Sequence, residues 1–411
     1  MRKQTGADLL RCECLDSVEA AHRRRVYPLM YCHMELLGHL DMERLKQAVS
    51  LSSGTVPEIL CAYDFKSGGF AKLGYTAGDA VKYVEEQAAS LLRQNLGSRP
   101  QLQIFVTPKR EHDLVMVIMS HILADGEGFL QYLYLLAALY NGGRLDSGIQ
   151  NMRDISPLLE NMRVFAPTEQ TKHSRHAATP PLRPASGGNQ FFCLTSQIPS
   201  GSMTVIRQRA KQCGATLNDV FMTAYARVIA SRQNINTVVL PCPADLRKFH
   251  PARNALTVAN MTGIYREIAV EISPESSFTA TLQQVHIEAA LQKSRRRCFS
   301  GINTLHKVFQ KVPLNVLEQA IKATYPLPPV SYTNCGVIDH EKLHFQNCSV
   351  QNCFLTGAYR LPPDFQLTVS SFRNKCTLNC TLIGTANDAE TGQQILDQVK
   401  CGILMWAERG S

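Results

Sequence analysis

The sequence lacks the long apolar segments that would place it in or across a membrane. No stretch of its 411 residues approaches the roughly 20 uninterrupted apolar residues that a membrane-spanning helix needs. Residues 1–8 are basic but lack the apolar core of a secretory signal peptide. We therefore expect a protein without a membrane span that works in the cytoplasm.

Ligand pairs at metal-binding spacing are also lacking. None of the fourteen cysteines forms a Cys-x-x-Cys pair, and Cys12 and Cys14 stand too close together for a zinc knuckle. Most of the cysteines lie in apolar, strand-like contexts. This favours buried free thiols over disulfides, and we expect no bound metal.

The net charge of +9 is moderate for this length and is spread along the chain. Such a balance is too diffuse to indicate nucleic-acid binding, although it suits a protein that handles anionic small molecules or an acidic protein partner. Hydrophobic residues make up 45% of the chain and charged residues 19%, which is typical of a globular protein.

The length exceeds what one compact core usually accommodates, so two domains are expected. Residues 166–188 are polar, proline-rich and without periodicity, which predicts a linker. The linker would separate an N-terminal lobe of residues 1–165 from a C-terminal lobe of residues 189–411. No internal repeat is visible.

Hydrophobic periodicity predicts a chain of mixed strands and helices, an α/β (α+β) protein. Asp41 is expected to cap a helix, and residues 367–372 and 376–382 to form a hairpin. The other predicted elements are strands at 101–106, 114–120, 191–194 and 238–241, and helices at 76–97, 217–225 and 390–406.

Residues 121–126, His-Ile-Leu-Ala-Asp-Gly, are the most informative stretch of the chain. The residues before His121 are almost all apolar, as in a strand buried on both faces, and those after Gly126 have helical apolar spacing. His121 would thus lie at a strand-to-helix junction, where a side chain is held rigidly and still faces a cavity. A histidine followed at four residues by Asp125 and a glycine favours chemistry over a structural role.

The chain resembles the acyltransferases that share a His-x-x-x-Asp-Gly motif, among them condensation-domain-like proteins, alcohol acetyltransferases and, more distantly, chloramphenicol and plant acyltransferases. Residues 121–126 match the motif, and residues 38–45 match the first helix of such proteins. Residues 216–226 and 243–247 match the opening of their second half. Residues 330–336 match their late Ser-Asn-x-Gly segment, with one extra residue between the serine and the asparagine.

The resemblance implies two similar lobes of the chloramphenicol acetyltransferase type, each with a mixed sheet, arranged as a V around an active-site tunnel. It also implies a monomer with no bound cofactor. An acyl thioester of coenzyme A or of an acyl carrier protein would be the donor, and a small-molecule alcohol or amine the acceptor. Transfer would be direct, without a covalent enzyme intermediate.

The resemblance also implies a role for each motif residue. His121 would act as the general base, since histidine has an ordinary pKa of about 6.5 and accepts a proton near neutral pH. Asp125 would turn away from His121 and pair with Arg247 of the second half, which makes both structural residues. Gly126 would allow close backbone approach or an unusual dihedral angle.

Further candidates are less specific. Ser120 stands where condensation domains proper carry a second histidine, which favours an acetyltransferase over an amide-forming condensation enzyme. The candidates for shaping the acyl pocket or the oxyanion site are Ser331, Asn334, Ser370 and Ser371. The candidates for binding coenzyme A phosphates or a carrier protein are Lys293, Arg295, Arg296 and Arg297, for which a solvated helix face is an equal alternative. A degenerate member that only docks carrier proteins is the alternative function, although keeping His121, Asp125, Gly126 and Arg247 together favours catalysis.

Overall fold

A computed structural model describes most of the chain. The described residues are 9–87, 89–144, 148–160, 178–179, 181–182, 188, 190–252, 255–273, 275–309 and 311–409. The predicted linker at 166–188 lies almost entirely outside them, so its boundaries stay a prediction.

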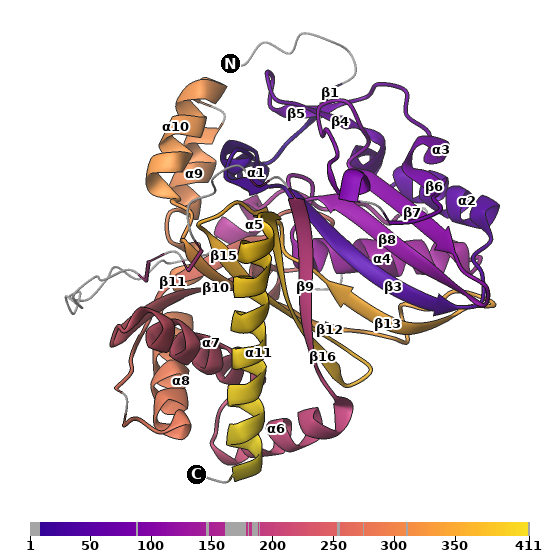
Figure 1. The fold of residues 1–411 in the computed structure, drawn as a ribbon. Coiled ribbons are helices and arrows are strands. Elements are labelled where there is room, and N and C mark those ends of the chain that lie inside the picture. Colours follow the sequence, from indigo (N-terminus) through magenta and orange to yellow (C-terminus); the bar gives the residue numbers. More distant parts are fainter. Residues whose placement is uncertain are drawn as a thin grey trace.

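The N-terminal half is built on a five-stranded mixed sheet of order β13-β3-β8-β7-β6. The four strands from β13 to β7 are antiparallel, and β6 joins the edge in parallel. Helices α2 and α4 contact each other beside this sheet (Figure 1). The elements are β3 (Leu29–Leu37), α2 (Met42–Ser53), η1 (Pro57–Leu60), α3 (Ala77–Ala80), β6 (Val81–Tyr83), η2 (Ala89–Leu92), β7 (Leu102–Pro108), β8 (His112–Ser120), α4 (Gly126–Tyr140), α5 (Ser156–Leu159) and β13 (Ser349–Leu355).

The C-terminal half is built on a six-stranded sheet of order β12-β15-β16-β14-β2, in which β9 also pairs with β16. The long helix α11 contacts β9 and β16 of this sheet and helices α6 and α7. The elements are β2 (Val26–Tyr27), β9 (Gln190–Ile198), α6 (Ser200–Gln212), α7 (Leu217–Gln233), β12 (Val330–Ile338), β14 (Tyr359–Arg360), β15 (Phe365–Phe372), β16 (Lys375–Gly384) and α11 (Ala386–Arg409).

Two smaller sheets complete the fold. One is the pair β10-β11, which α8 contacts, and the other is β1-β5-β4. Helix α1 contacts α9 and α10 of the C-terminal half (Figure 1). The elements are β1 (Leu9–Arg11), α1 (Cys14–His22), β4 (Ala62–Asp64), β5 (Gly69–Ala71), β10 (Thr237–Asp245), η3 (Leu246–Phe249), β11 (Thr262–Glu271), α8 (Phe278–Ser294), η4 (Arg297–Phe299), α9 (Ile302–Phe309) and α10 (Leu314–Thr324).

The two halves exchange strands. Strand β13 comes from the C-terminal half but pairs with β3 in the N-terminal sheet, and β2 from the N-terminal half pairs with β14 in the C-terminal sheet. Figure 1 shows β13 lying along β3, although more than 300 residues separate them. The chain therefore crosses between the sheets directly before β3, at Pro28.

Local signals in the sequence explain most elements. Asp41 caps α2 by accepting from the backbone N–H groups of Glu43 and Arg44, as predicted. A capping box between Thr216 and Asp219 starts α7. The predicted hairpin is β15–β16, and other predicted elements correspond to β7, β8, β9, β10, α4, α7 and α11.

The predicted helix at residues 76–97 is wrong. The structure has only the short helix α3, followed by the edge strand β6 and the single turn η2. Strand β6 pairs in parallel with β7, with Val81 opposite Ile104, so sheet pairing outweighs the helical spacing of the apolar residues. β-Branched Val81 and aromatic Tyr83 suit a strand.

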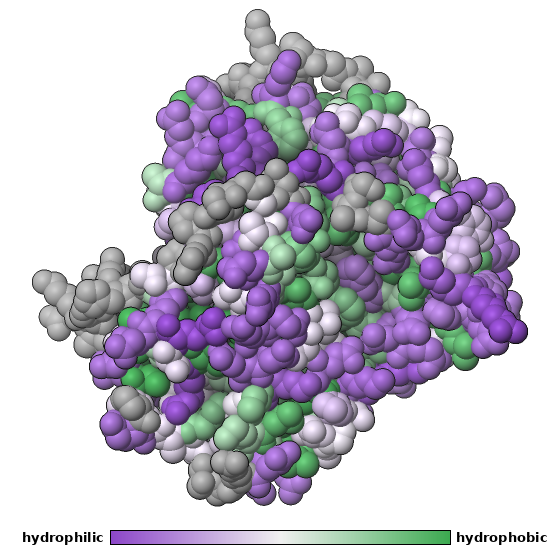
Figure 2. All heavy atoms as spheres, viewed as in Figure 1, coloured by the Kyte–Doolittle hydropathy of each residue, from purple (hydrophilic) through white to green (hydrophobic). Residues whose placement is uncertain are grey.

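The core surrounds strand β8, whose last six residues, Val115–Ser120, are all buried. All fourteen cysteines are free and only Cys401 is exposed, in agreement with the expected buried thiols. No helix of the described residues is long and apolar enough to cross a membrane. The face seen in Figure 2 is mostly hydrophilic, with small groups of hydrophobic residues between the polar ones.

Candidate active site

His121 directly follows β8 and precedes the motif turn that leads into α4. Its backbone N–H donates to the carbonyl of Pro28 at 2.8 Å, and its carbonyl accepts from Nδ2 of Asn260 at 2.9 Å. The backbone at His121 is thus fixed from the N-terminal half on one side and from the C-terminal half on the other.

One of the two ring nitrogens of His121, Nδ1, is buried in the protein interior. It has no hydrogen-bond partner among the described residues, and the nearest acid is Glu19 of α1, with Oε2 at 3.8 Å. The side chain is still 23% exposed, so the accessible edge of the ring is the one that carries Nε2. Nε2 is therefore the ring nitrogen that can meet a substrate.

Asp125 does not orient His121. Its carboxylate caps α4 by accepting from the backbone N–H of Gly128 at 2.9 Å, and it also accepts from the Met261 N–H at 2.7 Å and the Thr262 hydroxyl at 2.8 Å. Two nitrogens of Arg247 contact it at 3.0 Å each. The expected Asp125–Arg247 pair is therefore present and joins the motif to the second half.

Arg247 lies in η3, directly after β10, and its guanidinium is fully engaged. Besides Asp125 it donates to Asp245, to the Thr257 hydroxyl and to the carbonyls of Thr257 and Ala259, at 2.7 to 3.1 Å. Burial alone would raise the pKa of Asp125, but the charge of Arg247 and the hydrogen bonds hold that pKa below its ordinary value. Asp125 is therefore ionised and serves as a structural anion.

A second buried network holds the same loop. Asp16 of α1 pairs with Arg153 at 2.7 Å, and Arg153 also donates to the carbonyl of Leu123 at 2.9 Å. Nδ2 of Asn260 joins Asp16 at 2.9 Å to the carbonyls of His121 and Ile122. The sequence prediction did not include Glu19, Asp16, Arg153 or Asn260.

The expectation for Gly126 is wrong. It does not have a positive φ, and a Cβ atom there would lie 3.7 Å from Sγ of Cys335, an ordinary contact. The close approach is at Gly128, where a Cβ would come within 2.8 Å of the Ala259 carbonyl oxygen. A glycine is therefore required at position 128, where α4 packs closely against Ala259. The carbonyl of Ala259 also accepts a hydrogen bond from Arg247.

Among the hydrogen bonds of the described residues, none joins a candidate for the acyl pocket to His121, and each candidate lies against another part of the fold. The hydroxyl of Ser331 lies 3.4 Å from the Phe365 carbonyl, and that of Ser370 accepts from the Leu355 N–H at 3.2 Å. The amide of Asn334 donates to Oδ1 of Asn218 at 3.1 Å. Ser371 is half-buried opposite Cys376. The neighbour of Asn334, Cys335, is the residue of β12 that approaches the motif.

The basic residues at the end of α8 do not form one exposed cluster. Lys293 is exposed, whereas Arg295, Arg296 and Arg297 are half-buried. Arg296 lies over the ring of Phe249 at 5.8 Å. The role of these residues in phosphate or carrier binding stays a prediction.

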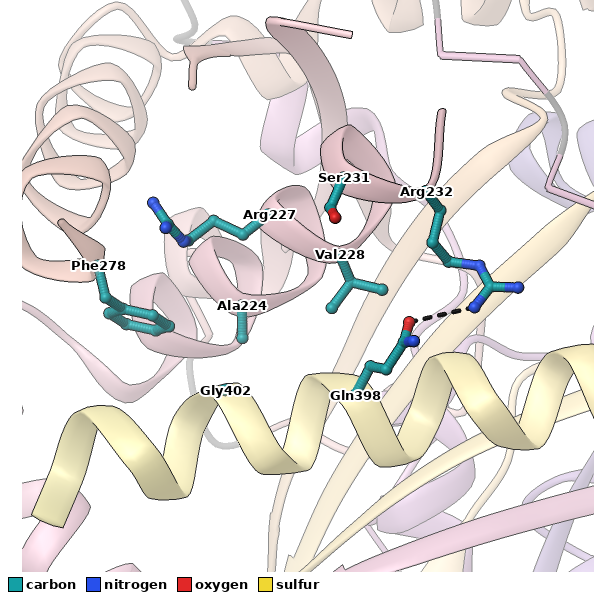
Figure 3. Close-up of a pocket in the computed structure, with 8 residues that line it drawn as sticks. All are labelled: Ala224, Arg227, Val228, Ser231, Arg232, Phe278, Gln398 and Gly402. Atoms are coloured by element: carbon teal, nitrogen blue, oxygen red, sulfur yellow. Dashed lines mark hydrogen bonds between the residues drawn. The ribbon is translucent and has the colours of Figure 1, made fainter. Parts of the chain in front are cut away.

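A surface hollow lies elsewhere, between α7, the start of α8 and α11 (Figure 3). Arg227 and Arg232 line it, and Arg232 donates to Gln398 of α11 at 3.2 Å. No residue of the motif lines it. Within the described ranges, no group of three or more His, Cys, Asp or Glu residues could hold a metal ion.

Solved structures with this fold include an acetyltransferase, a polyketide synthase associated protein and condensation domains. Polyketide synthase associated protein 5 from Mycobacterium tuberculosis is 12% identical, with a TM-score of 0.71 over 99% of this chain and 100% of its own. The TRI3 trichothecene 15-O-acetyltransferase from Fusarium sporotrichioides is 13% identical, with a TM-score of 0.68 over 98% and 97%. The condensation domain from the Monacolin K polyketide synthase MokA is 13% identical, with a TM-score of 0.65 over 97% of each chain.

The chain therefore has the fold of coenzyme A-dependent acyltransferases and condensation domains, with two lobes and mixed sheets, as predicted. No protein-family model matches the sequence, and no curated protein sequence matches it. At these sequence identities the likeness shows the fold and not the activity.

Proposed function

We propose that this protein is an acyltransferase that moves an acyl group from a thioester to a hydroxyl or amine acceptor. The observation that carries the proposal is the His121 ring, whose accessible edge projects from a loop that two buried ion pairs hold rigid. A functional side chain needs to be held in place by a supporting shell of this kind. The occurrence of an acetyltransferase among structures with this fold supports the same activity.

His121 acts as the general base in this mechanism. As the acceptor oxygen or nitrogen attacks the thioester carbonyl carbon, its proton moves to Nε2, and the carbonyl electrons shift to the oxygen. When the carbonyl re-forms, the carbon–sulfur bond breaks and the leaving thiolate takes the proton from His121. The Glu19 carboxylate lies 3.8 Å from Nδ1 and can form an ion pair with the ring once the ring carries the proton.

The donor is an acyl thioester of coenzyme A or of an acyl carrier protein. The net charge of +9 suits either anionic donor. The carrier-bound donor is supported by neighbours in polyketide and peptide synthesis, such as a polyketide synthase associated protein and a polyketide synthase condensation domain. Ser120 stands where condensation domains proper carry a second histidine, which favours an acetyltransferase-like enzyme over an amide-forming condensation enzyme and leaves both hydroxyl and amine acceptors open.

The test is thiol release from acetyl- and longer acyl-coenzyme A with a panel of alcohols and amines. Acceptor-dependent release by the wild type that vanishes in His121→Ala supports the proposal. His39→Ala is the matched control, because His39 pairs with Asp113 and is half-exposed outside the motif. Glu19→Gln is expected to retain activity at a reduced kcat.

Equal background release in the wild type and in His121→Ala would contradict the use of coenzyme A. The same assay with acyl carrier proteins then separates a carrier-bound donor from the alternative function. Carrier binding without transfer in any variant would identify a docking platform and overturn the catalytic proposal.

A further inference from the structure

Arg360 is a buried arginine whose guanidinium is not matched by the protein. Its side chain lies in β14 and the residue is only 8% exposed. Neither Nε nor Nη1 has a hydrogen-bond partner among the described residues, and none of the ion pairs found there includes Arg360. Burying a charge without a partner is energetically costly, so an arginine in this position suggests a ligand that supplies the missing acceptors.

Strand register places Arg360 beside the motif histidine. Arg360 pairs with Val26 of β2, two residues before Pro28, and the Pro28 carbonyl accepts the backbone N–H of His121 at 2.8 Å. The negative charge of Glu19, the acid closest to His121, also acts on Arg360. The Arg360 backbone therefore lies close to the point where the chain crosses between the two sheets, next to His121.

The carboxylates of Asp364 and Glu19 both act on the charge of Arg360, but neither forms an ion pair with it among the described residues. The nearby carboxylate of Asp364 is held by Arg25 at 2.6 Å through Oδ2. The hydroxyl of Tyr225, on α7, is buried with no hydrogen-bond partner among the described residues. Burial raises its pKa well above the ordinary value, and the charge of Arg360 opposes this rise. Nε and Nη1 of Arg360, the Tyr225 hydroxyl and Oδ1 of Asp364 are thus buried polar atoms without a hydrogen-bond partner in the described part of the chain.

We propose that Arg360 binds a carboxylate of the donor or the acceptor in the acyl transfer for which His121 is the general base. A guanidinium presents its N–H donors in a plane that matches a carboxylate, and burial strengthens the pairing. The two nitrogens without an acceptor, Nε and Nη1, suit the two oxygens of one carboxylate. The proposal rests on the proposed function for the reaction at His121, and it adds the substrate class.

The carboxylate can come from either substrate, and matched pairs distinguish the two sources. For the acceptor, hydroxy and amino acids are compared with their methyl esters. For the donor, succinyl-coenzyme A is compared with butyryl-coenzyme A. Arg360→Met is expected to lower kcat/KM for the carboxylate-bearing member of one pair by about 10- to 100-fold, and to leave the neutral member within about threefold. Arg360→Lys should restore part of the loss.

Arg25→Met is the matched control, since Arg25 lies close by but is already paired with Asp364 and more than half exposed. It should not discriminate between carboxylate and neutral substrates. Equal losses for both members of each pair in Arg360→Met would overturn the proposal, because they would indicate a structural role.

Binding gives a readout that does not depend on turnover. In His121→Ala, small carboxylates such as benzoate and succinate should raise the melting temperature, their amides should not, and Arg360→Met should abolish the effect. If this pattern appears without any acyl transfer, the carboxylate site stands and the proposed function fails. Stabilisation by inorganic phosphate alone, or by carboxylates and amides equally, would overturn the carboxylate site.

Discussion

Arg247 and Arg360 are buried to almost the same degree but are surrounded differently. Arg247, 7% exposed, has Asp125, Asp245, a hydroxyl and two carbonyls as acceptors. Arg360, 8% exposed, has Nε and Nη1 without an acceptor among the described residues. Burial is therefore not what separates a structural arginine from a binding one. The presence or absence of acceptors in the protein separates them.

The electrostatic balance of the two side chains follows from this difference. Burial acts to lower the pKa of both guanidinium groups. Around Arg247, Asp125 and Asp245 more than offset burial and the pKa is raised, whereas around Arg360 burial prevails and the pKa is lowered. Arg247 is stabilised by the folded protein itself, while Arg360 would be stabilised by an added anion.

The largest expected effect comes from removing the matched arginine. Arg247→Met leaves Asp125 buried without its cation and leaves the acceptors at Thr257 and Ala259 unpaired. The free energy of unfolding should fall by about 3–5 kcal/mol, as for other broken buried pairs. Urea unfolding followed by circular dichroism measures the loss.

The control for this prediction is the double variant Arg247→Met with Asp125→Asn. Removing the orphaned charge should recover part of the stability, with a coupling energy between the two sites. Additive losses would mean that the two residues do not act as a pair.

A smaller effect is expected at Asn260, which lies between the two networks. Asn260→Ala removes the donor shared by Asp16 and the carbonyls of His121 and Ile122. We expect a loss of about 1–3 kcal/mol, with a larger proportional drop in kcat than in 1/KM because the His121 loop loses its support. Steady-state kinetics beside urea unfolding would test it, and unchanged kcat in a stable variant would contradict it.

The sequence predicts the matched pair better than the unmatched arginine. Asp125 and Arg247 belong to segments with recognisable spacing, at residues 121–126 and 243–247, so their pairing could be expected. Asp16, Arg153 and Arg360 carry no motif, and their partners are set by contacts across hundreds of residues, as between Asp16 and Asn260. Only the folded chain shows whether such a charge is paired.

The elements of the fold also divide into those that local sequence signals predict and those that depend on long-range pairing. Elements with local signals, such as the helix capped by Asp41 and the hairpin β15–β16, were predictable. The strand β6 was not, because its pairing with β7 outweighs a helical apolar pattern at 76–97. The exchange of β2 and β13 between the sheets also depends on long-range pairing, which leaves no periodic signal.

The unmatched arginine should behave in the opposite way to Arg247 when it is removed. Arg360→Met replaces a buried charge with an apolar side chain of similar length, and no acceptor among the described residues is left unpaired by the loss of Nε or Nη1. The ligand-free protein should keep its free energy of unfolding or gain up to about 1 kcal/mol. Urea unfolding beside Arg247→Met provides the comparison. A loss as large as that of Arg247→Met would show that Arg360 is a structural residue.

The smallest expected effect is on how the stability of the protein depends on pH. The pKa of Asp125 in the folded protein lies below its ordinary value of 3.8 because of Arg247 and the hydrogen bonds, although burial opposes this. A carboxyl group with a lowered folded pKa binds more protons when unfolded. Its contribution to stability is therefore complete above the ordinary value and is lost as pH falls through the folded value.

Urea midpoints measured from neutral pH into the acid range should thus fall less steeply for Asp125→Asn than for the wild type. Arg360→Met should keep the wild-type slope, because none of the ion pairs found in the described residues joins it to a carboxylate. Equal slopes for Asp125→Asn and the wild type would mean that the pair adds no pH-dependent stability. A shallower slope for Arg360→Met would mean that Asp364 or Glu19 relies on Arg360 in the folded state, and the contrast between the two arginines would be lost.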